Sequence, residues 1–188
     1  MDSPQGKDSP RGNPTPIEID GLSVSAERDL QIASLRYFHN AGTFAAAVRE
    51  AVGRALPEPL RALQVGSAAQ GSYVILAWRS PTETLLLSNG RAAFDELERQ
   101  LAAALDGCMV NLTGGIDVFR VRGEKAGDLL LRLGAATAIP NQGEARSGRL
   151  AELQVLTACL APSEFLLLVE RVYANHLLEW ISATAADL

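Results

Sequence analysis

The sequence contains little of the material from which most active sites are built. Its 188 residues include two histidines, His39 and His176, and two cysteines, Cys108 and Cys159. The motifs GxGxxG, GxxxxGK[ST], GxSxG and HExxH are all absent, so nucleotide-binding, acyl-hydrolase and zincin activities have no support. Two unrelated histidines and two cysteines outside a CxxC motif do not make a zinc-ligand pattern. The sequence therefore predicts no catalytic residue and no metal ligand, and it leaves any cofactor-binding residue unknown.

Positive charge and long apolar runs are also scarce. Lys and Arg number 17 against 22 Asp and Glu, and the net charge of -5 argues against non-specific nucleic-acid binding. No apolar run approaches the ~20 residues of a membrane helix. Residues 1–16 are polar and lack the apolar centre of a signal peptide. Without a secretory context the cysteines are expected to be reduced and buried. We expect a cytoplasmic protein that binds neither nucleic acid nor membrane.

A few side chains allow a functional interpretation beside a structural one. His176 and Glu179 could form a pair on a helix, but residues three positions apart on a helix more often share a solvated face. Cys108 could be an exposed nucleophile, although a small buried hydrophobe is favoured. Trp78 and Trp180 are expected in the core or at an interface.

The glycine pair Gly114-Gly115 lies within Leu112–Asp117 and also has two interpretations. Backbone amides exposed by paired glycines can hold an anion such as a carboxylate. Within a long strand, however, two glycines more often mark a bulge or a close backbone approach. The bulge is favoured.

What the chain does contain is apolar material for one domain. At 47% hydrophobic residues it can form a sizeable core. Residues 1–21 are rich in proline and polar side chains and cannot bury enough apolar area, so they are expected to form a flexible tail. The remainder, residues 22–188, is expected to be a single domain.

That domain shows an internal duplication. Adding 81 to the numbers of Pro81–Leu87 (PTETLLL) gives Pro162–Leu168 (PSEFLLL), in which proline, glutamate and three leucines coincide. The same offset relates Gly53 to Gly134, and after the leucines an offset of 80 relates Leu97 to Leu177. Further pairs at the offset of 81 are Gly42 with Gly123 and Val74-Ile75 with Val155-Leu156. A further pair at the offset of 80 is Leu101 with Ile181.

Each repeat, residues 30–105 and 108–185, has the pattern of a βαββα unit. Two such units predict an α+β fold with mostly antiparallel sheets flanked by helices. The runs Val74–Ala77 and Leu85–Leu87 are apolar on both faces, so helices or a partner chain are expected to cover both sides. Residues 135–148 are expected to be an irregular loop. The expected strands are 30–38, 73–78, 84–87, 109–121, 150–160 and 164–169, and the expected helices are 43–55, 91–105, 126–133 and 173–181.

The expected helices present their apolar side chains along one face. In residues 43–55 this face holds Phe44, Val48, Ala51 and Ala55, and Thr43 is expected as the N-cap. The other inward residues are expected to be Ala93, Phe94, Leu97 and Leu101; Ala126, Leu129, Leu130 and Leu133; and Tyr173, Leu177, Trp180 and Ile181.

The stretch Val110–Leu131 resembles a recurrent segment of the glycine-cleavage T-protein superfamily. There a D-[VL]-S strand is followed by [FL]-x-[VL]-x-G-x-x-A-x-x-[FL]-L. In the first element, Asn111 and Thr113 stand where Asp and Ser are usual. The second element is supplied by Phe119, Val121, Gly123, Ala126, Leu129 and Leu130.

Within that superfamily the sequence is most similar to the sarcosine oxidase gamma subunit family, over residues 25–185. The matching features are Leu30–Arg36, Leu56-Pro57, the W-x-x-P-x-E-x-L-L element at Trp78–Leu86, and the hairpin and helix of Glu164–Ile181. The resemblance implies a folate-binding-type domain of the T-protein/TrmE N-terminal kind.

The resemblance also implies a non-catalytic gamma subunit of heterotetrameric sarcosine oxidase. In that family the larger subunits oxidatively demethylate sarcosine and pass the one-carbon unit to tetrahydrofolate. FAD, FMN, NAD and tetrahydrofolate are therefore expected on partner subunits, with no cofactor in this chain. The expected partner surface is the folate-binding region of the largest subunit.

Two alternatives remain open. A stand-alone folate-binding one-carbon transferase would resemble the T-proteins, which are longer chains with an acidic residue where Asn111 stands. A folate-linked iron–sulfur assembly factor would carry a K-G-C-[FY]-x-G-[QE] motif, and neither Cys108 nor Cys159 lies in such a sequence.

Overall fold

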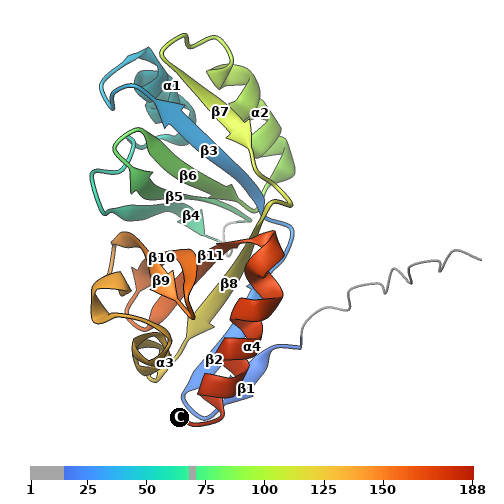
Figure 1. Cartoon of the computed structure of the whole chain (residues 1–188). Coiled ribbons are helices and arrows are strands. Elements are labelled where there is room, and N and C mark those ends of the chain that lie inside the picture. The colour runs from blue at the N-terminus through green and yellow to red at the C-terminus, as the bar shows by residue number, and fades with distance from the viewer. Residues whose placement is uncertain (1–14, 68–70) are drawn as a thin grey trace, which may run out of the picture.

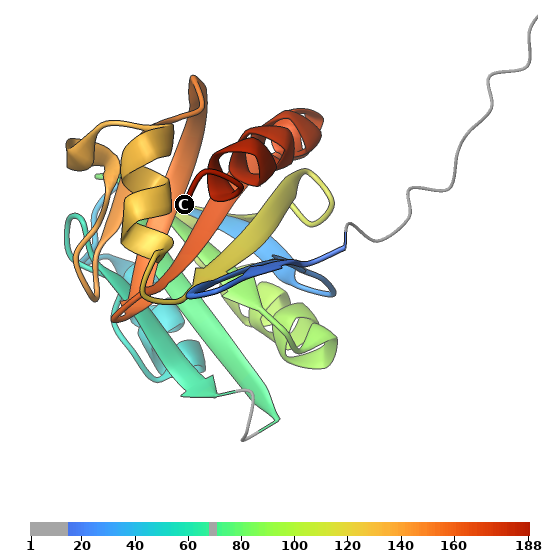
Figure 2. The same ribbon diagram turned by 90° about the horizontal axis from the view of Figure 1, so that it is seen from below.

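The computed structural model describes residues 15–67 and 71–188. Two antiparallel sheets face each other, and each is covered on its outer side by two helices, so the layers run helix, sheet, sheet, helix (Figures 1 and 2). This arrangement confirms the predicted α+β class with antiparallel sheets flanked by helices.

Sheet B is formed by five strands in the order β4-β5-β6-β3-β7, with helices α1 and α2 on its outer face. The bounds of its elements are β3 Gln31–Tyr37, α1 Thr43–Val52, β4 Ala62–Ser67, β5 Ser72–Ser80, β6 Glu83–Ser88, α2 Arg91–Leu101 and β7 Gly107–Asn111.

Sheet A is formed by six strands in the order β1-β2-β8-β11-β10-β9, with helices α3 and α4 on its outer face. Two short 3-10 helices, η2 Ala136–Ala138 and η3 Arg171–Tyr173, lie in its connections. The other bounds are β1 Ile17–Ile19, β2 Leu22–Glu27, β8 Ile116–Arg122, α3 Ala126–Leu133, β9 Ala145–Leu150, β10 Leu153–Ala161, β11 Glu164–Glu170 and α4 Ala174–Ala185.

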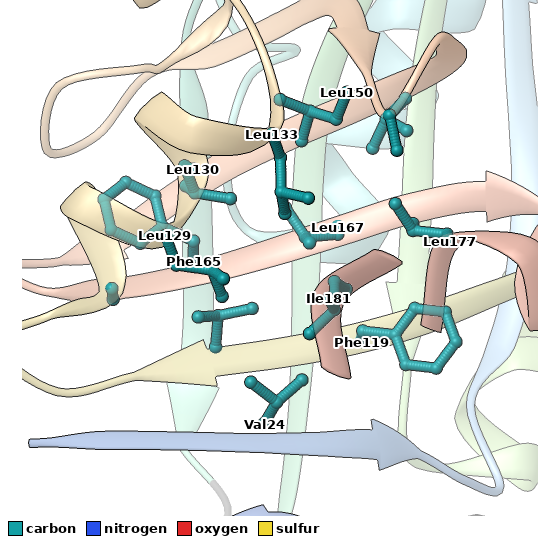
Figure 3. Packing of buried hydrophobic residues seen from close by; sticks show 14 of the residues in the cluster. Val24, Phe119, Leu129, Leu130, Leu133, Leu150, Phe165, Leu167, Leu177 and Ile181 are labelled. Atoms are coloured by element: carbon teal, nitrogen blue, oxygen red, sulfur yellow. The ribbon is translucent and has the colours of Figure 1, made fainter. Parts of the chain in front are cut away.

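The strands that are apolar on both faces lie between two layers of the same chain. On their inner face, Ile75 and Leu87 of sheet B pack with Leu156, Leu166 and Leu168 of sheet A. On their outer faces the sheets contact their own helices, as Figure 3 shows for the cluster that contains Phe119, Leu130 and Ile181. Helices cover one side and the opposite sheet covers the other, so these runs give no indication of a partner chain.

The duplication is confirmed most clearly in the second hairpin of each half. Ile75 faces Leu87 in β5–β6, and Leu156 faces Leu168 in β10–β11. The pairing shifts between Trp78 and Ser80 in one hairpin and between Cys159 and Ala161 in the other, so the same bulge recurs 81 residues later.

The first strands of the two halves do not follow the offset of 81. Ala33 faces Leu86 and Phe119 faces Leu167, so β3 and β8 are related by 86 residues. The five-residue difference arises between the first strand and the end of the first helix. Val52 ends α1 15 residues after Tyr37, whereas Leu133 ends α3 10 residues after Gly123, the residue that corresponds to Tyr37 at the offset of 86.

Each half contains one strand more than predicted, so the units are βαβββα and not βαββα. The missed strands are β4 and β9. An isolated antiparallel bridge joins Arg61, just before β4, to Glu144, just before β9. Strand β9 occupies part of the loop expected at 135–148. The strand expected at 150–160 is divided by a tight turn at Ala151 and Glu152, both with positive φ.

The strand that precedes each unit pairs with the sheet of the other unit. Strand β2 precedes β3 along the chain but pairs with β8 in sheet A. Strand β7 precedes β8 but pairs with β3 in sheet B. This reciprocal exchange links the two halves, and it also places β2 and β7 in equivalent positions.

The C-terminal end of the predicted tail differs from expectation. Residues 1–14 lie outside the described residues. Ile17–Ile19 forms β1, which pairs with β2 across a turn at Asp20 and Gly21, where Gly21 has a positive φ. Ile17 and Ile19 pack against the core between sheet A and its helices, so the prediction of a tail up to residue 21 is wrong for this segment.

Several predicted helix faces need correction. All four predicted inward residues of α3 are buried. In α1, Ala51 is exposed because Phe44, Ala45 and Val48 form the buried face, and Ala55 lies beyond the end of the helix at Val52 and is exposed. In α2, Ala93 is exposed and the helix ends at Leu101 instead of residue 105. Tyr173 and Trp180 are also exposed, because Ala174, Leu177, Ile181 and Ala185 form the inner face of α4.

Candidate functional site

The two histidines lie in unrelated parts of the surface. His39 is exposed in the turn after β3, and His176 is exposed on α4, where its ring lies 6.4 Å from that of Trp180. No hydrogen bond or ion pair joins His176 to Glu179 within residues 15–67 and 71–188. Over the same residues, no group of three or more His, Cys, Asp or Glu side chains could hold a metal ion.

The cysteines differ from each other. Cys159 is buried in β10, its Sγ donates to the carbonyl of Ala161 at 3.3 Å, and burial raises the pKa of its thiol. Cys108 is exposed, so the prediction that it is buried is wrong. The reason is its place on β7, an edge strand in which no residue is buried.

The glycine pair is a turn that carries the chain from sheet B to sheet A, and not a bulge within one strand. Gly114 has a positive φ, and the Gly115 amide donates to the Leu112 carbonyl. The Arg171 guanidinium donates to the carbonyl of Gly114. The Gly115 amide therefore already has a partner within the turn and is not free to hold an anion.

Asn111 and Thr113, which depart from the T-protein pattern, complete the end of β7. The Asn111 carboxamide oxygen accepts the Thr113 amide at 2.9 Å. The Thr113 hydroxyl oxygen in turn accepts the Ile32 amide at 2.9 Å, in place of the backbone carbonyl that would continue the ladder. Both side chains therefore have a structural role here.

A group of charged side chains lies on the inner face of sheet A, beside Gln64 and Tyr73 of sheet B. Arg120 is buried and donates to the carboxylates of Glu27, at 2.6 Å, and Glu164. Arg122 donates to Glu164 at 3.2 Å. Burial by itself raises the pKa of Glu164, but the hydrogen bond from Arg120 and the charges of both arginines outweigh it and hold that pKa below its usual value.

A related but smaller group lies in sheet B. Glu83, the counterpart of Glu164 in the duplicated hairpin, accepts from the Ser34 hydroxyl at 2.6 Å and from Arg79 at 3.2 Å. Ser34 also accepts from the Nε of Arg36 at 3.3 Å. Arg36 makes no ion pair within the described residues.

An apolar groove opens beside this second group. Phe38 is 78% exposed and Leu105 is 96% exposed, although both are large hydrophobic residues. We call it the β7 groove, and its lining includes Arg36, Phe38, Glu83, Leu105, Asp106 and Cys108.

The wall of the β7 groove is fixed by Asp106. Its carboxylate accepts the Phe44 amide at 2.7 Å and the Thr43 hydroxyl, so it caps the first turn of α1 from outside the helix. Thr43 was expected to be the N-cap itself, but it is the first helical residue, after Gly42. The hydrogen bond from Thr43 lowers the pKa of the Asp106 carboxyl.

The exposed hydrophobic residues of this groove were missed by sequence analysis. Phe38 follows the last residue of β3, and Leu105 lies in the connection from α2 to β7. Both stand at the end of an apolar pattern, where they read as its continuation. The helical pattern gave no signal of this, because Leu105 follows Leu101 by four residues although α2 ends at Leu101.

No helix in the part of the chain that the structure describes is both long and apolar enough to cross a membrane.

Two solved structures share this fold. A chain of the heterotetrameric sarcosine oxidase from Corynebacterium sp. U-96, in complex with pyrrole 2-carboxylate, is 20% identical with a TM-score of 0.76, over 88% of this chain and 84% of that chain. The glycine cleavage system aminomethyltransferase T from Bartonella henselae is 14% identical with a TM-score of 0.64. That match covers 86% of this chain and 45% of the aminomethyltransferase.

Among curated proteins, none matches the sequence at a significant level. The profile of the sarcosine oxidase gamma subunit family matches residues 39–187, which span both halves of the duplicated fold. The chain therefore belongs to the sarcosine oxidase gamma subunit family.

Proposed function

We propose that the chain is a non-catalytic subunit of a cytoplasmic sarcosine-oxidase-type complex. In this proposal the larger subunits demethylate sarcosine oxidatively, pass the one-carbon unit to tetrahydrofolate, and carry the FAD, FMN, NAD and folate. Membership of the gamma subunit family supports this role, as does the similarity in fold to a chain of a heterotetrameric sarcosine oxidase.

The observation that carries the proposal is the exposed apolar β7 groove. Phe38 and Leu105 keep most of their surface in solvent in the isolated chain. Burial of apolar surface contributes about 25 cal/mol per Å², so a partner that covers these side chains gains affinity. Large exposed apolar residues that cluster beside a strand edge are typical of protein–protein interfaces.

The proposed contact on the partner is the folate-binding region of the largest subunit. The fold of this chain is similar to that of an aminomethyltransferase T, of which it spans less than half. A partner region with the same fold would bring similar sheets and helices to the interface. This supports a packing of related domains, with the β7 groove as the surface contributed by this chain.

Co-expression with candidate larger subunits tests the proposal. With an affinity tag on the largest subunit, we expect this chain to co-purify in a stoichiometric amount with a flavin-containing complex that oxidises sarcosine. An active complex of the larger subunits that forms without this chain, and does not bind it when it is added, would contradict the proposal.

Calorimetry separates this role from that of a stand-alone folate-dependent transferase. Titration of the isolated chain with tetrahydrofolate at high micromolar concentration is expected to give no heat of binding. The hydrogen bond that Asn111 already makes with Thr113 is consistent with this expectation. Saturable heat would favour the transferase.

A further inference from the structure

Sheet B lacks a strand that its counterpart has. Sheets A and B match strand for strand from β9-β10-β11-β8-β2 to β4-β5-β6-β3-β7. Sheet A then continues with β1, which runs antiparallel to β2. No strand in the described residues continues sheet B beyond β7, so the duplicated fold leaves one position beside β7 unfilled.

The backbone of β7 is oriented to receive a strand at this position. The Phe38 amide donates to the Asp106 carbonyl and the Leu112 amide donates to the Ile32 carbonyl. Because hydrogen-bonding residues alternate along an antiparallel strand, the amides and carbonyls of Gly107, Met109 and Asn111 point away from β3. They form the outer edge of the sheet. Strand β7 has no buried residue, whereas β2, which has β1 beside it, buries Leu22 and Val24.

The side chains that β7 and β2 carry on the inner faces of their sheets also differ. Cys108 and Val110 of β7 face Arg36 and Ser34 across the ladder, and at the equivalent positions β2 carries Ser23 and Ser25. Leu112, just after the end of β7, takes the position of Glu27 in β2 and already packs against the core between the sheets. Two strands in the same place in the fold thus carry Cys and Val on the inner face in one sheet and two serines in the other. The polar set suits contact with solvent, and the apolar set suits contact with protein.

The charge of Arg36 indicates which kind of group a partner would place in the β7 groove. Arg36 and Arg122 are equivalent through the first-strand offset, and Arg122 pairs with Glu164 at 3.2 Å. Arg36 lines the β7 groove and is bound by the Ser34 hydroxyl alone, with no carboxylate among the described residues. The acidic groups nearby are engaged, Glu83 by Arg79 and Asp106 by the first turn of α1. A guanidinium at the edge of an apolar surface favours a partner that carries a carboxylate.

From these observations we propose that an extended segment of a larger subunit adds to sheet B as an antiparallel strand beside β7. The segment places apolar side chains in the β7 groove, against Phe38 and Leu105, and a carboxylate against Arg36. This inference rests on the proposed function, because it requires a partner subunit. It adds the place of contact and the mode of binding, which is strand addition to a sheet edge.

Hydrogen exchange distinguishes strand addition from contact between side chains only. In the assembled complex, the outward amides of Gly107, Met109 and Asn111 are expected to exchange more slowly than in the free chain. The amides of β2 serve as the internal control, because β1 already covers that edge. A stable complex in which exchange in β7 is unchanged would overturn the proposal while leaving the proposed function intact.

Substitutions in the groove provide a second measurement. Phe38→Asp and Leu105→Asp are each expected to weaken binding to the larger subunits about thirtyfold, as at other interface hot spots. Arg36→Gln is expected to weaken it about tenfold through loss of the ion pair. The matched controls are Val172→Asp, since Val172 is 79% exposed on the other half, and Arg54→Gln, at an exposed position just after α1. Groove variants that bind as tightly as these controls would also overturn the proposal.

A second copy of this chain is the competing occupant. We expect the isolated chain to be monomeric in light scattering coupled to gel filtration. A dimer that Phe38→Asp dissociates would place a second copy at β7 and overturn the proposal. Failure of any complex to form with the larger subunits would instead contradict the proposed function.

Discussion

Glu83 and Glu164 occupy equivalent positions in the two halves of the molecule, and each accepts a hydrogen bond from a side chain of the first strand of its half. In the first half the donor is the hydroxyl of Ser34, and in the second it is the guanidinium of Arg120. The glutamate is therefore the same in both halves, but its partner on the first strand is neutral in one half and charged in the other.

Loss of Arg120 is expected to destabilise the chain by about 3 kcal/mol, because Arg120→Met leaves two partly buried carboxylates without their shared partner. Ser34→Ala is expected to cost about 1 kcal/mol, since Glu83 keeps Arg79. Urea unfolding followed by circular dichroism measures both. Arg91→Met, in an exposed pair with Asp95, is the control and should change stability by less than about 0.5 kcal/mol. Equal costs for the three variants would contradict the account of the ion-pair cluster.

The same cluster predicts a loss of stability in acid. The pKa of Glu164 in the folded chain lies below its ordinary value of 4.5, so folding favours the charged carboxylate. Its contribution is complete above that ordinary value and is lost as the pH falls through the lower pKa of the folded state. We expect Glu164→Gln to be less stable than the native chain at pH 7 and to lose less stability on acidification. Glu179→Gln, at an exposed position on α4, should follow the native pH profile.

Gly107 is required by close packing at the start of β7. A Cβ at this position would lie 2.7 Å from the Arg36 carbonyl oxygen and collide with the Phe44 ring. Gly107→Ala is therefore expected to lower the free energy of unfolding by about 2 kcal/mol. Gly127→Ala is the matched control, because a Cβ there meets nothing within 4 Å and alanine favours the helix, for a gain of about 0.5–1 kcal/mol. Thermal melts of the two variants should shift in opposite directions.

The two thiols are expected to react differently in the free chain. Cys108 is exposed and should react with a maleimide under native conditions. Cys159 is buried and its pKa is raised by burial, so it should react only after denaturation. Mass spectrometry of the labelled chain checks this, and rapid labelling of both thiols in the native state would contradict the structure. Cys159→Ser should remove only the label that appears after denaturation.

The sequence predicted the duplicated hairpins β5–β6 and β10–β11 and the helix α3 better than the rest of the fold. The leucine runs of β6 and β11 are fully buried, so their pattern is strong and their offset of 81 is also the structural one. Strands β4 and β9 were missed because they are edge strands that each contain a glycine and bury only one or two of their six residues. Local pattern does not reveal the exchange of β2 and β7 between sheets, which depends on contacts between distant segments.

The candidate site was less predictable for a related reason. Cys108, Tyr173 and Trp180 were expected to be buried because they are apolar residues within or beside apolar patterns. Whether such a residue faces the core depends on tertiary packing: β7 is an edge strand without a buried residue, and other residues of α4 form the inner face of that helix. The β7 groove is therefore a property of the assembled sheets. The absence of recognisable catalytic motifs, by contrast, could be read from the sequence directly.

The reactivity of Cys108 in the assembled complex tests the central claim most directly, because this thiol lies in the β7 groove. Maleimide labelling of the free chain is compared with that of the chain bound to the larger subunits. The account predicts that Cys108 reacts rapidly when free and as slowly as Cys159 when bound. A complex in which Cys108 keeps the reactivity that it has in the free chain would contradict the claim that β7 is the docking surface.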